Sequence, residues 1–521
     1  MHTPFDQDFG LIAETIAGHA RRESAHLALV DARETLDYGA LDALMDRVAA
    51  SLQRDGVRPR ESIAICAAAS ARYAAVFLGA LRAGVVVAPL APGETPKSLA
   101  GMLADSGAKR LFVDAAADAS FGPSEAGAVP RIMLDGAGAG AGAGPALDDW
   151  LAAPGIAPAP VSPGPDWPFN IIYSSGTTGT PKGIVQPHAM RWAQVRRGGT
   201  AYGYGPDGTT LLATPLYSNT TLVVFLPTMA WGGTAVLMAK FNATEYLRLA
   251  ERHRATHTML VPVQYQRIMA LPEFGRFDLS SFRMKFCTSA PFSAALKADV
   301  LARWPGGLTE FYGMTEGGGS CVLHAHEHPD KLDTVGQPME GHDIRLIDDA
   351  GAELGPGATG EVIGRSASMM LGYHGQLAKT REAEWISPQG ERFIRTGDVG
   401  RFDADGFLTL LDRKKDMVIS GGFNIYPSDL EAALREHAAV ADVAVVGVPS
   451  EQWGETPVGF VVRRQGAGAS EAELLQWFNQ RIGKTQRLAA LHFIDELPRS
   501  AIGKVLKREL RELHRALPGS R

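Results

Sequence analysis

One loop of this sequence combines glycines, hydroxyl residues and a lysine, a set that could bind phosphate. The loop consists of Ser174, Ser175, Gly176, Thr177, Thr178, Gly179, Thr180, Pro181, Lys182 and Gly183. Glycines let a backbone approach a ligand closely, hydroxyl and N–H groups can surround phosphate oxygens, and a lysine can balance their charge. The spacing is not that of a Walker A loop, because Pro181 precedes Lys182 and Gly183 follows it. The pattern predicts a phosphate-binding loop after an apolar strand at 169–172, and the alternative is a flexible surface turn.

This loop is similar to the phosphate loop of the AMP-forming adenylating enzymes. That family contains acyl-CoA synthetases, the amino-acid-activating domains of peptide synthetases and beetle luciferases. Further motifs resemble those of the family and follow in family order along nearly the whole chain, at 312–316, 395–398, 420–427 and 497–504. The resemblance implies an α/β fold, with a large N-terminal domain of mixed or parallel sheets and a small α+β C-terminal domain on a hinge.

The resemblance implies that ATP binds to residues from several of these motifs. Tyr312 would stack on adenine, Thr315 would reach the α-phosphate, and Glu316 would hold Mg²⁺, a cation that prefers oxygen ligands. Asp398 would accept hydrogen bonds from both ribose hydroxyls, and Arg413 would also contact the ribose. The backbone that contacts the adenine edge in the family corresponds here to Ser289, Ala290 and Pro291.

Lys504 matches the lysine that catalyses adenylation in the family. Attack of a carboxylate on an anionic α-phosphate brings like charges together, and a cation placed beforehand relieves this repulsion. Lys415 matches the hinge position. Gly421 and Gly422 match a glycine-rich motif that would let the pantetheine arm of CoA pass along the backbone. Trp453 would either stack on the CoA nucleotide or be a structural residue of the domain surface.

The acyl pocket is expected to involve Tyr217, Ser218 and Asn219, and CoA ligases commonly have histidine where Ser218 stands. These polar groups would hydrogen-bond a polar acyl group or cap the start of a helix. No aspartate lies between 211 and 225, so an α-amino group would lack a counter-charge, and a carboxylic acid without that amine is expected. Medium-chain, alicyclic and aromatic acids all remain open. The resemblance adds to this pocket Gly313, Met314, Gly317 and Gly318, and the small residues would make it roomy.

Helices and strands alternate along the N-terminal part, which predicts a largely parallel sheet. Apolar spacing predicts helices over 36–54, with Asp37 as the cap, and over 72–83, and strands at 62–66, 84–89 and 110–113. Apolar runs between 210 and 236 alternate with glycine and proline breaks, and a strand and a helix separated by Pro262 are expected within 254–271. The Gly-Ala repeat at 136–144 predicts a flexible loop.

A charged run at 412–416 predicts a boundary between an N-terminal domain, 1–411, and a mobile C-terminal domain, 412–521. The C-terminal part has its own pattern of predicted elements, which are helices at 428–437 and 470–482 and strands at 443–448 and 458–462.

Length and composition argue against several other classes of protein. A chain of 521 residues is too long for one core, and a net charge of −6 argues against a nucleic-acid-binding surface. The three cysteines are too scattered for a disulfide framework or a zinc site, and His324, His326 and His328 lack a companion ligand cluster. No export signal is visible and no apolar run reaches the roughly twenty residues that span a membrane, so a cytoplasmic protein is expected.

The resemblance therefore implies an ATP-dependent carboxylate–CoA ligase that uses ATP, Mg²⁺ and CoA and forms an acyl-adenylate. An acyl-AMP ligase that delivers the acyl group to a carrier protein is the main alternative, and a luciferase-like oxygenase is another. A non-catalytic nucleotide-binding regulator is disfavoured, because Lys182, Glu316, Asp398 and Lys504 are all present. A homodimer is compatible with the sequence, which does not specify the oligomeric state.

Overall fold

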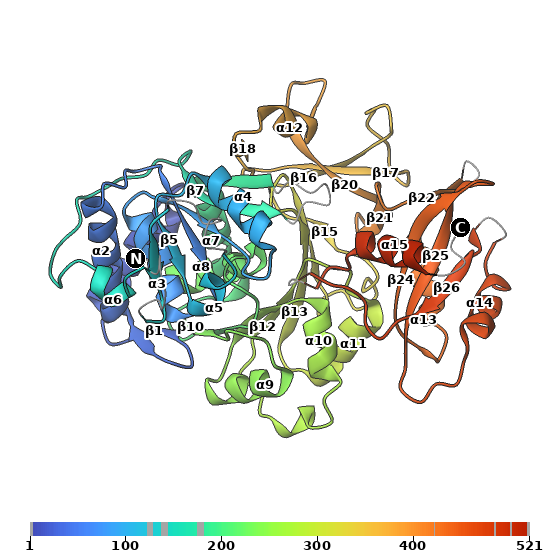
Figure 1. Ribbon diagram of the computed structural model, residues 1–521, viewed down its shortest axis with the longest axis horizontal. Coiled ribbons are helices and arrows are strands. Elements are labelled where there is room, and N and C mark those ends of the chain that lie inside the picture. Colours follow the sequence, from blue (N-terminus) through green and yellow to red (C-terminus); the bar gives the residue numbers. More distant parts are fainter. Residues whose placement is uncertain are drawn as a thin grey trace. The chain divides into compact units, whose positions relative to one another are not determined.

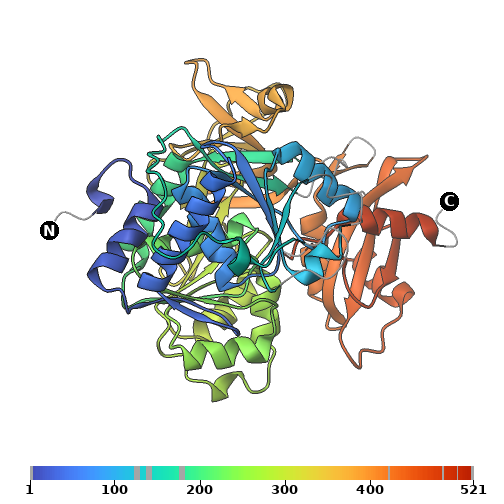
Figure 2. The same cartoon turned by 60° about the vertical axis from the view of Figure 1, so that its left-hand side comes forward.

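The computed structural model describes residues 4–121, 129–136, 144–174, 182–420, 423–483, 486–500 and 503–517 (Figures 1 and 2). The chain divides into two compact units. The large unit contains residues 1–344 and 364–394, and the small unit contains 345–363 and 395–521. Both units combine helices with sheets, which confirms the predicted α/β class. The domain boundary predicted between residues 411 and 412 stays a prediction.

A seven-stranded sheet in the large unit carries the ends of the predicted phosphate loop. Its order is β18-β8-β7-β4-β3-β5-β6. The strands are β3 (Ser62–Cys66), β4 (Val86–Pro89), β5 (Leu111–Val113), β6 (Arg131–Met133), β7 (Pro168–Ser174), β8 (Lys182–Pro187) and β18 (Gly372–Tyr373). Strands β3 to β7 are parallel wherever they pair with one another, as predicted, while β8 runs antiparallel to both β7 and β18. Ser174 pairs with Lys182, so the phosphate loop joins two paired strand ends.

A nine-stranded sheet in the same unit has the order β15-β14-β13-β12-β11-β9-β10-β1-β2. Its strands are β1 (Leu27–Val30), β2 (Thr35–Asp37), β9 (Thr209–Leu212), β10 (Thr234–Leu237), β11 (His257–Leu260), β12 (Met284–Cys287), β13 (Gly307–Gly313), β14 (Ser320–His324) and β15 (Gln337–Pro338). Strands β9 to β13 are parallel to one another. The loops after β12 and β13 therefore leave the same edge of the sheet, where ligands of α/β proteins commonly bind.

Several helices of the large unit begin after a residue whose side chain caps them. Helix α2 (Tyr38–Arg54) starts after Asp37, whose carboxylate accepts a hydrogen bond from the backbone N–H of Ala40 at 2.7 Å, as predicted. The predicted helix over 72–83 is α3 (Ala71–Arg82), and the predicted strand and helix around Pro262 are β11 and α10 (Pro262–Met269). Helices α7 (His188–Tyr202) and α8 (Asn219–Ala230) pack together, and buried residues of both contribute to the main core.

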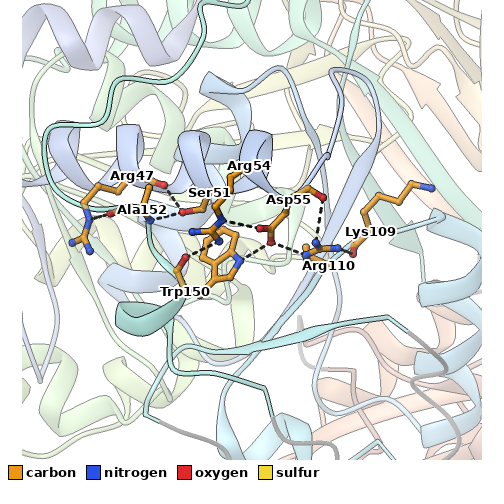
Figure 3. A network of polar contacts seen from close by, with 8 residues as sticks. All are labelled: Arg47, Ser51, Arg54, Asp55, Lys109, Arg110, Trp150 and Ala152. Atoms are coloured by element: carbon orange, nitrogen blue, oxygen red, sulfur yellow. Dashed lines mark hydrogen bonds and ion pairs between the residues drawn. The ribbon is translucent and has the colours of Figure 1, made fainter.

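A polar network at the end of α2 holds distant segments together (Figure 3). The carboxylate of Asp55 accepts hydrogen bonds from the side chains of Trp150 at 2.8 Å and of Arg110 and Arg54 at 3.0 Å. Burial raises the pKa of Asp55, but these donors lower it more, so the carboxylate stays ionised. The network joins α2 to β5 and to helix α6 (Leu147–Trp150), which follows the Gly-Ala repeat. Most of that repeat, 137–143, lies outside the described residues.

The small unit contains a sheet of order β23-β22-β25-β24, with β26 paired to β25. Its strands and helices are β22 (Val418–Ser420), β23 (Phe423–Ile425), β24 (Val440–Ser450), β25 (Gly454–Arg463), β26 (Ala490–Phe493), α13 (Pro427–Arg435), α14 (Glu471–Asn479) and α15 (Lys507–Ala516). Val443 and Val445 pack into the core with α13 and α14, whereas Ala444 and Val446 pack with Leu510 of α15. Both faces of β24 are therefore buried, which explains its continuous apolar run.

A five-stranded sheet has the order β16-β17-β20-β19, with β21 paired to β20. Its strands are β16 (Asp343–Ile347), β17 (Thr359–Arg365), β19 (Glu384–Ile386), β20 (Arg392–Phe402) and β21 (Leu408–Arg413). Strands β20 and β21 are antiparallel, and their register pairs Asp398 with Arg413.

The three cysteines, Cys66, Cys287 and Cys321, are all free and buried. In the described part of the chain, no helix has the length and apolar character that crossing a membrane requires.

Candidate active site

The two ends of the predicted phosphate loop are fixed by neighbouring side chains and backbone. Ser174 ends β7 and Lys182 begins β8, whereas Ser175, Gly176, Thr177, Thr178 and Gly179 lie outside the described residues. The hydroxyl of Tyr173 donates a hydrogen bond to Asp105 at 2.7 Å, and burial raises its pKa so that it keeps its proton. The backbone N–H of His374 donates to the carbonyl of Gly183 at 2.7 Å. The stem of the loop is therefore held on both strands.

Two charged residues predicted from separate motifs contact the same tyrosine. The ammonium of Lys182 lies 4.9 Å from the ring centre of Tyr373, close enough for a cation–π contact. The hydroxyl of Tyr373 donates a hydrogen bond to Glu316 Oε1 at 2.9 Å. Burial raises the pKa of Tyr373, as does the carboxylate, so the hydroxyl remains a donor at neutral pH. Tyr373 was not predicted from the sequence, because a two-residue strand has no periodic pattern.

The backbone around Thr315 and Glu316 is fixed from two directions. Gln186 of β8 donates a side-chain hydrogen bond to the carbonyl oxygen of Thr315 at 2.6 Å. The backbone N–H of Met370 donates to the carbonyl oxygen of Glu316 at 2.8 Å. Tyr312 and Gly313 end strand β13 just before this segment, and Tyr312 is half-buried. These contacts hold the segment from two sides.

The predicted adenine loop follows β12 and contains one strained residue. Ser289 has φ +83°, a left-handed conformation that is unusual for a residue with a side chain. Its hydroxyl hydrogen-bonds the hydroxyl of Thr220 at 2.6 Å, at the start of α8. Ala290 is half-buried and Pro291 is exposed. The contact joins the predicted adenine loop to the segment predicted to line the acyl pocket.

The predicted acyl-pocket residues Tyr217, Ser218 and Asn219 lie at the start of α8. Ser218 is the N-cap, and its hydroxyl accepts a hydrogen bond from the backbone N–H of Thr220 at 3.2 Å, which confirms the capping alternative for this residue. Asn219 Oδ1 accepts a hydrogen bond from Gln186 at 3.4 Å. Burial raises the pKa of Tyr217 to about 12, so its hydroxyl is neutral at physiological pH.

The glycines after Glu316 stand where the backbone has no room for a side chain. Gly317 and Gly318 have φ values of +75° and +87°, which favour glycine. A Cβ atom at Gly317 would lie 2.0 Å from the carbonyl oxygen of Ser368, and one at Gly318 would lie 2.8 Å from that of Gly364. Neighbouring backbone therefore leaves no room for a side chain at either position, and the roomy acyl pocket stays a prediction. Met314 packs against a small cluster that includes Tyr373.

In the small unit, the predicted ribose-binding residues form an ion pair. Arg413 Nε donates to Asp398 Oδ1 at 2.9 Å, across the β20–β21 pair. The Asp398 side chain is 14% exposed and that of Arg413 is 45% exposed, so one partner is largely buried and the other reaches solvent. Lys415, the predicted hinge residue, is exposed, and partial desolvation lowers its pKa.

Lys504 lies on a short hairpin that begins after Leu497. Arg499 pairs with Val505, the backbone N–H of Ser500 donates to the carbonyl of Lys504 at 2.8 Å, and Gly503 has φ +76°. The side chain of Lys504 is exposed. Trp453 is also exposed, by 48%, while Gly421 and Gly422 lie outside the described residues.

The alternating histidines have structural contacts in the large unit. His324 Nδ1 lies 3.1 Å from the hydroxyl of Thr309, and His326 Nδ1 lies 3.1 Å from the carbonyl of Leu308. Across the described ranges, no group of three or more His, Cys, Asp or Glu residues could hold a metal ion.

Two models of known protein families match the chain. The family model of AMP-binding enzymes matches residues 16–374, and that of the AMP-binding enzyme C-terminal domain matches residues 429–504. The chain belongs to the AMP-binding enzyme family. This result confirms the resemblance found in the sequence motifs.

Curated relatives match the chain over nearly their whole length. Rice (Oryza sativa subsp. japonica) 4-coumarate–CoA ligase 5 is 33% identical over 94% of this chain and 92% of its own. Indoleacetate–CoA ligase of Aromatoleum aromaticum is 32% identical over 96% and 98%, respectively. The fatty acid–[acyl-carrier-protein] ligase ScoC of Streptomyces coeruleorubidus is 30% identical over 96% of both chains. The similarity confirms the predicted enzyme class, an AMP-forming acid–thiol ligase in the CoA ligase branch.

Two solved structures show the same fold. ATP-bound MatB from Rhodopseudomonas palustris has a TM-score of 0.86 and 29% identity, covering 97% of this chain and 99% of its own. The amide bond synthetase McbA from Marinactinospora thermotolerans has a TM-score of 0.83 and 28% identity, covering 96% and 99%. Both similarities extend over the large and the small unit.

Proposed function

We propose that this chain is an ATP-dependent carboxylate–CoA ligase that forms acyl-CoA, AMP and pyrophosphate through an acyl-adenylate. The arrangement of Lys182, Tyr373 and Glu316 carries the proposal. A cation and an oriented carboxylate lie beside the fixed ends of a phosphate loop, which suits a triphosphate and its metal ion. Full-length similarity to two named CoA ligases supports the choice of CoA as the acceptor.

In the first half-reaction, the substrate carboxylate attacks the α-phosphorus of ATP, a new P–O bond forms, and pyrophosphate leaves. Lys182 neutralises phosphate charge, and Thr315 donates a hydrogen bond to the α-phosphate. Glu316 would hold Mg²⁺, because Tyr373 orients its carboxylate and this ion commonly binds through one or two carboxylates and substrate phosphates. When bound, the ion supplies positive charge for the leaving pyrophosphate. Lys504 supplies the cation for the attack itself.

In the second half-reaction, the CoA thiolate attacks the acyl carbonyl carbon, a thioester forms, and AMP leaves. We assign the change between half-reactions to rotation of a C-terminal domain, 412–521, about Lys415. Gly421, Gly422 and Trp453 would then contact CoA, and Asp398 with Arg413 would hold the ribose in both steps.

The substrate is a medium-chain, alicyclic or aromatic carboxylic acid, and the names of two relatives favour an aromatic acid. Tyr217 is neutral and half-buried, so it offers a hydroxyl donor and a ring to such an acid. An acyl-AMP ligase that delivers its product to a carrier protein is the second candidate, because ScoC matches over 96% of both chains.

A pyrophosphate-release assay over a panel of carboxylic acids tests the proposal. Each acid is assayed with ATP and Mg²⁺ alone, with CoA, with a phosphopantetheinylated carrier protein, and with an amine acceptor. Turnover that requires CoA supports the CoA ligase. A single turnover that CoA leaves unchanged but the carrier protein increases would favour the second candidate, and turnover with the amine alone would contradict both.

A further inference from the structure

Arg191 of α7 is fully buried, yet no carboxylate pairs with it in the part of the chain that the structure describes. Its guanidinium instead donates to three side-chain amide oxygens. Nε donates to Asn170 at 3.0 Å, Nη1 donates to Gln194 at 2.9 Å, and Nη2 donates to Gln186. Burial lowers the pKa of Arg191 to about 9, so the group is still charged at neutral pH. A buried cation without an acidic partner is costly and calls for a reason.

The guanidinium fixes the orientation of the Gln186 amide, because it contains hydrogen-bond donors only. Gln186 Oε1 accepts hydrogen bonds from Arg191 and from Asn170 Nδ2, the latter at 2.8 Å. The amide nitrogen of Gln186 must therefore point the other way. Its two N–H groups donate to the carbonyl of Thr315 at 2.6 Å and to Asn219 Oδ1 at 3.4 Å. Asn170 and Gln186 are both fully buried, so water does not compete for these bonds.

This chain of hydrogen bonds ends on the peptide that joins Thr315 to Glu316. Rotation of that peptide would move the Thr315 hydroxyl and the Glu316 carboxylate together. From the other side, the hydroxyl of Tyr373 contacts the carboxylate of Glu316. The carbonyl of Thr315 is thus positioned by Gln186, and the carboxylate of Glu316 is positioned by Tyr373.

We propose that Arg191 is a positioning residue for adenylation, acting through Gln186 on the Thr315–Glu316 peptide and on Asn219. The inference rests on the proposed function, which assigns phosphate and Mg²⁺ contacts to that peptide and an acyl contact to Asn219. It adds that one buried arginine positions both the peptide that contacts phosphate and Mg²⁺ and the asparagine that contacts the acyl group.

Gln186→Met and Gln194→Met form a matched pair of variants. Each removes one amide partner of Arg191, but only Gln186 contacts Thr315. We expect Gln186→Met to lower kcat for ATP–pyrophosphate exchange on the order of 10- to 100-fold, because small displacements of reacting groups have effects of that size. Its apparent Mg²⁺ requirement should also rise. Gln194→Met should leave both quantities close to wild type.

Gln186→Glu separates positioning from stability. A glutamate keeps the acceptor for Arg191 and gains an ion pair, but it has no N–H for the Thr315 carbonyl. We expect its thermal midpoint to match or exceed that of Gln186→Met while kcat stays low. Recovery of kcat by Gln186→Glu would overturn the proposal, as would equal losses of kcat in Gln186→Met and Gln194→Met.

Two measurements on the wild-type protein distinguish failure of this inference from failure of the proposed function. The first is the rise in thermal midpoint caused by Mg²⁺ and ATP, and the second is acid-dependent exchange. Absence of both in the wild type would contradict the proposed function. Their presence, together with wild-type kcat and Mg²⁺ requirement in Gln186→Met, would contradict the positioning role alone.

Discussion

The two units present their candidate functional groups in different ways. In the large unit, Lys182 and Glu316 are half-buried and share contacts with Tyr373, and buried side chains fix the backbone around them. In the small unit, Lys504 and Trp453 are exposed on turns of the chain. Groups that bind phosphate throughout a reaction gain from fixed geometry, whereas groups needed in only one half-reaction must be able to leave. The difference therefore predicts distinct consequences for substitutions in each unit.

The largest expected effect is that of Lys504→Ala. We expect adenylation to slow by roughly a hundred- to a thousand-fold, because an electrostatic group of this kind contributes about 3–4 kcal/mol to transition-state stabilisation. Formation of acyl-CoA from supplied acyl-AMP should be nearly unchanged, and the thermal midpoint should not move, since the side chain is exposed. The two half-reactions are measured separately by pyrophosphate exchange and by thioester formation.

Arg508→Ala is the control for this prediction, because it removes another exposed cation four positions along the chain. It should leave both half-reactions intact. Equal losses in the two half-reactions of Lys504→Ala would contradict a role confined to one of them.

A smaller loss is expected for Tyr373→Phe in the large unit. The change removes the hydroxyl that donates to Glu316 but keeps the ring beside Lys182. A hydrogen bond to a charged group is worth about 1.5–3 kcal/mol, so adenylation should slow by about tenfold or more, with a higher Mg²⁺ requirement. Tyr204→Phe is the matched control, because the buried Tyr204 hydroxyl has no hydrogen-bond partner among the described residues. Wild-type Mg²⁺ dependence in Tyr373→Phe would contradict the role given to this contact.

The sequence predicted the elements that follow from periodicity and missed contacts that depend on tertiary structure. The predictions of Asp37 as a helix cap and of a strand at 443–448 were correct, because capping and burial leave local patterns in the sequence. Pro227, read as a break, lies inside α8, where a buried apolar helix tolerates it. The motifs indicated Lys182 and Glu316, but nothing local indicated Tyr373 or the Arg191–Gln186 contact. Those pairs join strands and helices far apart in the chain, and only the folded arrangement brings them together.

In the small unit, Asp398→Asn tests a half-exposed site. The substitution removes the negative charge that pairs with Arg413 and one strong acceptor for the ribose hydroxyls. We expect the KM for ATP to rise about three- to tenfold with a small change in kcat, because asparagine keeps a neutral acceptor and loses only the roughly 1 kcal/mol by which a charged hydrogen bond exceeds a neutral one. Asp207→Asn, which breaks the exposed ion pair with Arg283, should leave this KM unchanged. An unaltered KM in Asp398→Asn would argue against ribose binding by this pair.

Two buried lysines extend the comparison to stability. Lys285 in the large unit donates to the carbonyl oxygens of Trp304, Pro305 and Gly306 at 2.7–3.2 Å, and burial lowers its pKa from 10.5 to about 7. Lys507 in the small unit is also largely buried, which alone would lower its pKa. The carboxylates of Glu431, Asp412 and Asp416 nevertheless raise that pKa above 10.5. Each unit thus holds a buried lysine, and the pKa values of the two lysines are shifted in opposite directions.

The last effect we predict is on stability alone, through Lys285. Between pH 7 and 10.5 the unfolded chain binds a proton at Lys285 that the folded chain does not, so stability should rise with pH by up to about 1.4 kcal/mol per unit. Lys285→Met abolishes this rise, so the thermal midpoint of wild type minus that of Lys285→Met should increase between pH 7 and 9. The same difference for Lys507→Met should stay constant, since its folded pKa and its ordinary value both lie above that range. A constant difference for Lys285→Met would mean that the three carbonyl oxygens keep the ammonium charged, and the two buried lysines would then behave alike.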